Sequence, residues 1–126
     1  MKFMIITKGR ESNAGPPPSP SLGAAIEELA EEARKSGALL ARGGLLPSAE
    51  AARIRMSSGQ IELMDGPFAE AREVIGGFAI YELESKEKAV EMAMGFMQLC
   101  KEHWPAWEGE VEIRPMFGFG SSAVTD

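Results

Sequence analysis

The spacing of hydrophobic residues along the chain predicts two helices. Residues 22–33 carry apolar side chains at helical spacing with glutamates on the opposite face, and Gly37 follows where such a helix would end. A second apolar stripe runs through residues 86–102, with Ser85 as its N-cap and Pro105 as its stop. Both helices are amphipathic, so each is expected to cover one face of a sheet.

Alternating or continuous apolar runs predict the strands. They span residues 2–8, 38–46, 53–57, 60–64, 76–83 and 110–114. Ser58-Gly59 separates the third run from the fourth as a short turn, which predicts a hairpin. Without that hairpin the order is strand–helix–strand twice, the split βαβ plan of ferredoxin-like domains. We therefore expect an α+β fold with a hairpin insertion and an antiparallel sheet that carries both helices on one face.

The alternation within the strands also predicts what each face of the sheet presents. The helix-covered face would take the apolar sets, which are Ile54, Met56, Phe78, Ile80, Val111 and Ile113. The other face would then gather Arg53, Arg55, Tyr81, Glu110, Glu112 and Arg114. Such a face is either solvated and salt-bridged, or it encloses a polar ligand cavity when it packs against the same face of a second copy.

Composition narrows the class of protein. The 126 residues, of which 44% are hydrophobic, suffice for one domain with a core, and we expect that domain to be residues 1–117, followed by a flexible tail, 118–126. The net charge of −6 argues against nucleic acid, and no apolar run is long enough to span a membrane. The single cysteine, Cys100, excludes an intrachain disulfide and fits a cytoplasmic location.

Residues 9–20, rich in Gly, Ser and Pro, are either a surface connection or a lid.

The turn Asp65-Gly66-Pro67-Phe68 is the most distinctive motif. Asp accepts local backbone hydrogen bonds, Gly permits positive φ, and Pro fixes φ. Further blocks stand in the same order along the chain: Met1-Lys2-Phe3-Met4, Gly44-Leu45-Leu46-Pro47-Ser48, Ala52-Arg53-Ile54-Arg55, Gly76-Gly77-Phe78, Ser85 with Ala89, and Glu112-Ile113-Arg114-Pro115. Together with Ala69-Glu70 after the turn, they make the chain resemble the DGPF, or YCII-related, family from about Met1 to Pro115.

The resemblance implies a dimeric α+β barrel, in which the sheets of two copies pack face to face, and a mostly bacterial, cytoplasmic setting. Some relatives in the wider superfamily are lyases, isomerases or oxygenases that act on small aromatic or lactone compounds, and genes of DGPF proteins often lie near sigma-factor genes. No single reaction follows, because a fold does not determine a function. The His/Asp pair of narrower YCII-type members has no counterpart, since the one histidine, His103, lies after the second helix.

The candidate site residues are Asp65 as the catalytic residue and Arg53, Glu70, Arg72, Tyr81 and Arg114 as substrate-binding residues. Asp65 could act as a general base, or it could accept hydrogen bonds from the amides of its own turn. Arg53 and Arg114 have the forked geometry that matches a carboxylate, or they could pair with acids nearby. Glu70 and Arg72 could equally form a solvated loop; relatives commonly carry lysine at the position of Arg72.

We expect no metal and no cofactor. A single histidine excludes a histidine-rich metal site, and His103 could shuttle protons or simply cap a helix beside Trp104. Cys100 lies on an apolar stripe, as buried structural thiols do. The glycine pairs Gly43-Gly44 and Gly76-Gly77 lack the Lys-Ser/Thr of a phosphate loop and instead suit bulges or close strand packing.

Three hypotheses follow from these residues, and the sequence does not decide whether the protein is an enzyme. The first is a lyase or isomerase that transfers a proton on a small organic acid or aromatic compound in the barrel cavity. The second is a non-catalytic homodimer that binds a small metabolite and regulates a protein partner, with sigma-factor regulation as one setting. The third is a structural dimer whose inner charges pair with each other.

Overall fold

The computed structural model describes residues 1–10, 18–68 and 74–119. In chain order these form β1 (Lys2–Gly9), α1 (Pro20–Lys35), β2 (Leu39–Gly44), a short 3₁₀ turn (Ser48–Glu50), β3 (Ala52–Ser57), β4 (Gln60–Asp65), β5 (Val74–Glu82), α2 (Lys86–His103) and β6 (Gly109–Pro115). The order confirms the split βαβ plan with an inserted hairpin. Most of the expected loop 9–20 and of the expected tail 118–126 lies outside the described residues.

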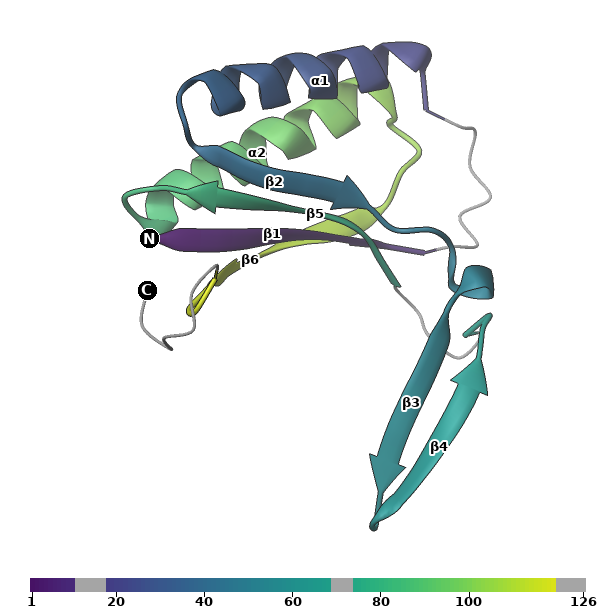
Figure 1. Ribbon diagram of the computed structural model, residues 1–126. Helices are drawn as coiled ribbons and strands as arrows, with labels where there is room; N and C mark the ends of the chain where they lie inside the picture. Colours follow the sequence, from purple (N-terminus) through teal and green to yellow (C-terminus); the bar gives the residue numbers. More distant parts are fainter. Residues whose placement is uncertain (11–17, 69–73, 120–126) are drawn as a thin grey trace.

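The strands form a four-stranded antiparallel sheet in the order β2-β5-β1-β6, and both helices lie on one face of it (Figure 1). We call the opposite face, which carries no helix, the open face. β3 and β4 pair only with each other and project from the end of the sheet, away from the helices (Figure 1). We call this hairpin, Ala52–Asp65, the arm.

Side chains at the helix ends explain where the helices begin and stop. The Ser19 hydroxyl accepts a hydrogen bond from the amide of Ser21 at the start of α1, and the Ser85 hydroxyl accepts one from Lys88 at the start of α2. Gly37, with φ +82°, takes the left-handed conformation that commonly follows a helix. The two helices are also joined end to end, because His103 Nδ1 lies 2.6 Å from Ser21 Oγ and its carbonyl accepts from the Ser19 amide.

The core lies between the helices and the central strands. Ile5, Leu39 and Tyr81 are buried there against alanines of both helices, and Val111 and Ile113 pack around them. This confirms that Val111 and Ile113 face the helices. Tyr81, in contrast, was assigned to the open face, and that assignment is wrong. Its register neighbours are Phe3 and Leu39, whose side chains are buried in the core.

Phe78 and Ile80 consequently lie on the open face, where Phe78 and Glu112 both pair with Ile6. The expectation that they face the helices failed for a physical reason. β5 and β1 are the two central strands, and their residues on the open face are apolar as well, so apolar character does not mark the helix side. Ile6 and Ile80 are both buried in the middle of that face.

The position of the arm contradicts the expectation that its apolar side chains face the helices. Ile54 and Met56 were expected beneath the helices, but the arm lies apart from the main sheet and both side chains are exposed. Its turn is as expected: Ser58 and Gly59 have φ of 51° and 77°, the positive values of the mirror-image turns that suit hairpins.

A candidate ligand cavity between the helices and the sheet

A cavity of about 810 Å³ opens between the two helices and the sheet. Its walls come from β1, β2, β5, both helices and the segment Leu45–Pro47. This volume falls in the range of about 300–1,000 Å³ that small-molecule sites occupy. The cavity lies on the helix-covered side, whereas the sequence had suggested one on the opposite face.

The space exists because small side chains face each other across the two layers. Ala30 of α1, Ala93 of α2, Thr7 of β1 and Ala79 of β5 all line the cavity, and Ala79 packs against the core cluster that contains Ala30 and Ala93. Protein interiors are normally packed as densely as organic crystals. Small residues on two facing surfaces therefore leave a cavity only where no larger side chain nearby fills the space.

Aromatic and aliphatic side chains make up most of the wall. Leu22 and Ile26 contribute from α1, Phe96 from the C-terminal half of α2, and Trp104 from the position directly after α2. Trp107 stacks beside Trp104 with ring centroids 6.2 Å apart and an angle of 29° between the planes. Such a wall favours a flat, largely apolar ligand.

A few polar groups interrupt the apolar lining. Tyr81 lines the cavity although its side chain is only 8% exposed, and burial raises its pKa above the usual value near 10 while the charge of Arg42 opposes that shift. The phenol therefore stays protonated at neutral pH and can donate a hydrogen bond. Arg42 and Arg10 bring positive charge to the lining, and Arg42 is held by an ion pair with Glu27 of α1.

Cys100 also lines the cavity, and burial raises the pKa of its thiol. A thiol rather than a thiolate is therefore present at neutral pH, and a thiol is a poor nucleophile. Among the residues that the structure describes, no carboxylate lines this cavity.

The structure separates the residues that were candidates for one site. Asp65 is exposed at the end of β4, Arg114 is exposed on β6, and Tyr81 lines the cavity. Glu70 and Arg72 lie outside the described residues. The described candidates therefore do not converge on one point, and only Tyr81 among them contacts the cavity.

Arg53 lies in a separate cluster at the base of the arm, formed by residues of the motifs that resemble the family. Its guanidinium lies 3.8 Å from the ring centroid of Phe68. The Phe68 amide donates to the hydroxyl of buried Ser48, and the Gly66 amide donates to the Ala51 carbonyl. The amides of this turn are thus bonded to residues before the arm, whereas the alternative role of Asp65 was to cap them.

Gly66 is required there by close approach of the backbone. A Cβ at this position would lie 1.6 Å from the Ser48 carbonyl oxygen, which no side chain can tolerate. Residues 44–48 and residues 65–68 are two separate blocks of the family resemblance. They are therefore packed against each other in the structure. We call Ser48, Arg53, Gly66 and Phe68 the turn cluster.

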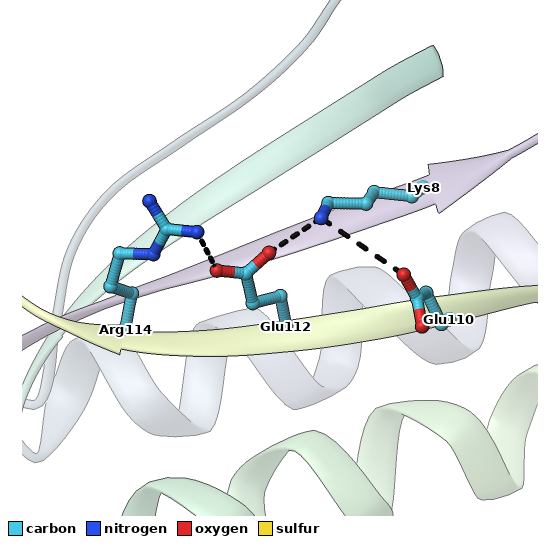
Figure 2. A network of polar contacts seen from close by, with 4 residues as sticks. All are labelled: Lys8, Glu110, Glu112 and Arg114. Atoms are coloured by element: carbon cyan, nitrogen blue, oxygen red, sulfur yellow. Dashed lines mark hydrogen bonds and ion pairs between the residues drawn. The ribbon is translucent and has the colours of Figure 1, made fainter. Parts of the chain in front are cut away.

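On the open face, charges line the edge formed by β1 and β6 (Figure 2). Lys8 Nζ lies 2.5 Å from Glu112 Oε1 and 4.0 Å from Glu110 Oε1, and Arg114 pairs with the other oxygen of Glu112. These partners raise the pKa of Lys8 and lower that of Glu112. This strip is the salt-bridged arrangement that the sequence left open as one alternative.

Two further features of the described residues bear on function. No group of three His, Cys, Asp or Glu side chains within residues 1–10, 18–68 and 74–119 is arranged to hold a metal ion. Within the same ranges, neither helix combines the length and the apolar character that crossing a bilayer requires.

The fold and the cavity define a small α+β protein with a ligand-sized space between its layers. The sequence model of the YCII-related domain matches residues 1–117, so the chain belongs to the YCII-related family. An uncharacterized protein of Rhizobium meliloti is 33% identical over 72 residues, which cover 57% of this chain. The match spans about half of that relative, 54% of its length.

A solved structure is similar over almost the whole chain. It is the 5-chloro-2-hydroxyhydroquinone dehydrochlorinase of Burkholderia phenoliruptrix in complex with 2,5-dihydroxybenzoquinone. The likeness covers 97% of this chain and all of that one, at 17% sequence identity and a TM-score of 0.41.

Sequence reasoning missed most of the cavity. Thr7, Arg42, Trp104 and Trp107 were not singled out for it, because the cavity expected from the sequence is a different one, between the open faces of two copies. One signal was present: the buried stripes of both helices are rich in alanine, which leaves space opposite the sheet. The register of β5, which decides that Tyr81 faces that space, has no such signal.

Proposed function

We propose that the protein binds a small, flat, largely apolar molecule with an acidic group in the cavity between its helices and its sheet. The observation that carries this proposal is the lining: aromatic walls, one protonated phenol and arginine charge around a space of about 810 Å³. Aromatic carboxylates and acidic phenols have this combination of properties.

Each polar group has a distinct role in this proposal. The Tyr81 hydroxyl donates a hydrogen bond to an oxygen of the ligand, because its raised pKa keeps the proton in place. Arg42 or Arg10 attracts the acidic group, and a guanidinium can bind a carboxylate through two parallel hydrogen bonds. The stacked indoles of Trp104 and Trp107 contribute apolar contact with the ring.

Binding is favoured over catalysis by the protonation states in the cavity. Tyr81 and Cys100 are protonated at neutral pH even at their ordinary pKa values, and burial raises both pKa values further, so neither is a base; no carboxylate among the described residues lines the cavity. A lyase or isomerase reaction by proton transfer needs a base, and Asp65 is the residue that we assigned to that role. Asp65 is exposed at the end of β4 and does not line the cavity, so for a substrate bound there Asp65→Asn should leave both binding and turnover unchanged; loss of turnover in this variant would instead support Asp65 as the base.

Thermal unfolding against a panel of aromatic carboxylates, phenols and lactones tests binding. A ligand at 100 times its Kd stabilises by about 2.7 kcal/mol, or roughly 5–10 °C in the unfolding midpoint. The variant Ala79→Leu fills the cavity and should remove this shift. Ala24→Leu makes the same change at an exposed position of α1 and should keep it. Equal shifts in both variants would place the ligand elsewhere.

We further propose that the protein is a homodimer in which the open faces of two sheets pack together. Apolar residues in the centre of this face support it: Met4 and Phe78 are partly exposed there, and they pair in register with the buried Ile80 and Ile6. The charged edge of Lys8, Glu110, Glu112 and Arg114 carries two charges of each sign and so does not repel its own copy.

A further inference from the structure

The arm has one apolar face and one polar face. Ile54 pairs with Leu63 in register, and Met56 pairs with Ile61, so these four side chains lie on one face. Their exposed fractions are 74%, 67%, 74% and 72%. The other face carries the pairs Arg53 with Met64, Arg55 with Glu62, and Ser57 with Gln60. Met64 is the exception on the polar face, and Asp65, which pairs with Ala52 at the base of the arm, is the exception on the apolar face. The alternation of the remaining pairs is the pattern of a strand pair with one covered face.

A hairpin of two strands is marginally stable in water unless something packs against it. In the described part of the chain, the four apolar side chains of the arm are left exposed. Residues 11–17, 69–73 and 120–126, which lie outside the described parts, contain no Leu, Ile, Met or aromatic residue, and Val124 is their one branched aliphatic residue. We therefore expect a cover for the apolar face of the arm to come mainly from another molecule.

The position of the arm indicates which molecule that is. It extends on the side of the sheet opposite the helices and flanks the space beneath the open face (Figure 1). Exposed apolar residues also lie where the chain passes between the sheet and the arm: Leu45 and Leu46 follow β2, and Ile75 is near the start of β5, and all three also line the cavity. A body that covers the open face would meet the arm as well.

We propose that the apolar face of the arm packs against a second copy of this chain. This inference rests on the open-face dimer proposed above and adds the arm to its interface. A twofold interface uses the same patch on both copies, so two arms would contribute eight apolar side chains in all. The charged face of the arm then forms the polar rim, in which Arg55 and Glu62 remain solvated beside the apolar centre.

Sedimentation velocity over a range of concentrations tests the contribution of the arm. Ile61→Lys and Gln60→Lys each add one positive charge at neighbouring positions on opposite faces of β4. We expect Ile61→Lys to weaken the dimer by roughly tenfold or more, the loss typical of a residue central to an interface. Gln60→Lys should leave the dimer unchanged. Circular dichroism should show both variants folded, because both positions are exposed.

A thiol-labelling experiment tests directly whether the second copy covers the apolar face of the arm. Cys100 is buried, so a cysteine introduced at Met56 or at Ser57 provides the main reactive thiol. When the dimer predominates, Met56→Cys should react with a maleimide more slowly than Ser57→Cys, and dilution to monomer should remove the difference. A dimer in which both thiols react equally fast would overturn the arm inference but not the open-face dimer. A monomer at every concentration would overturn both, and ligand binding in the cavity is measured independently.

Discussion

The cavity and the turn cluster differ in how visibly the sequence encodes them. The turn cluster is built from conspicuous residues, Gly66 among them, where the backbone approaches Ser48 too closely for any side chain. The cavity is built from ordinary ones, Ala30, Ala79 and Ala93, whose importance lies in the side-chain volume that they lack. A motif that stands out in a sequence can therefore mark a constraint on the backbone, while the space for a ligand goes unnoticed.

The two regions also differ in chemistry. The turn cluster satisfies its polar groups locally: the Phe68 amide donates to Ser48, the Gly66 amide donates to the neighbouring Ala51 carbonyl, and Arg53 lies over the Phe68 ring. The cavity keeps Tyr81 protonated and holds arginines at its lining. We therefore interpret the first region as architecture that supports the arm and the second as the place where a ligand binds. Mutations in each region should have different consequences.

The largest effect is expected from Gly66→Ala. The new methyl group would collide with the Ser48 carbonyl, and relieving the overlap should cost about 2–3 kcal/mol of stability, at the upper end of typical overpacking. Urea unfolding measures it. Gly95→Ala is the control, because nothing lies within 4 Å of a Cβ there and alanine should stabilise α2 by about 0.5–1 kcal/mol. Equal stability of the two variants would contradict close packing at Gly66.

A smaller and more specific effect is expected from Tyr81→Phe. The variant keeps the ring and removes the hydroxyl, so affinity for a ligand that accepts this hydrogen bond should fall by about 0.5–1.5 kcal/mol. Calorimetric titration with a ligand from the thermal screen measures it. Arg114→Ala, on the open face, should not change the affinity. A loss in Arg114→Ala with none in Tyr81→Phe would move the site to the open face.

The protonation of Tyr81 can be observed directly, because it is the only tyrosine in the chain. The raised pKa means that the folded state holds this proton more tightly than the unfolded state does. The resulting stability is fully present below the ordinary value near 10 and is lost as pH rises through the folded pKa. Tyrosinate absorbance should appear at higher pH in the folded protein than in urea; coincident titrations would contradict burial of the hydroxyl.

The smallest effect is expected from Glu112→Gln on the open face. Lys8 and Arg114 lower the pKa of Glu112, so its contribution is present above the ordinary carboxyl pKa and is lost as pH falls through the folded value. The Glu112 side chain is partly exposed to solvent, which screens its ion pairs, so we expect a shift in the unfolding midpoint smaller than that of Gly66→Ala. Midpoints at neutral and acidic pH measure it, and added salt should reduce any difference from the parent protein.

The sequence by itself determined the elements, their order and the family. The apolar stripes of residues 22–33 and 86–102, the cap at Ser85 and the turn at Ser58-Gly59 are local signals, and local signals survive without tertiary context. They predict the split βαβ plan and the hairpin because backbone preference and hydrophobic periodicity both depend on residues that are close together in the sequence.

Only the tertiary structure decided the faces and therefore the site. Both sides of the central strand β5 are apolar, so its pattern does not say whether Tyr81 or Phe78 meets the helices; pairing with Phe3 and Leu39 decides it. The arm likewise leaves the main sheet, which removes Ile54 and Met56 from the core where their alternation had assigned them. Which layers face each other, and how much space remains between them, depends on residues far apart in the chain.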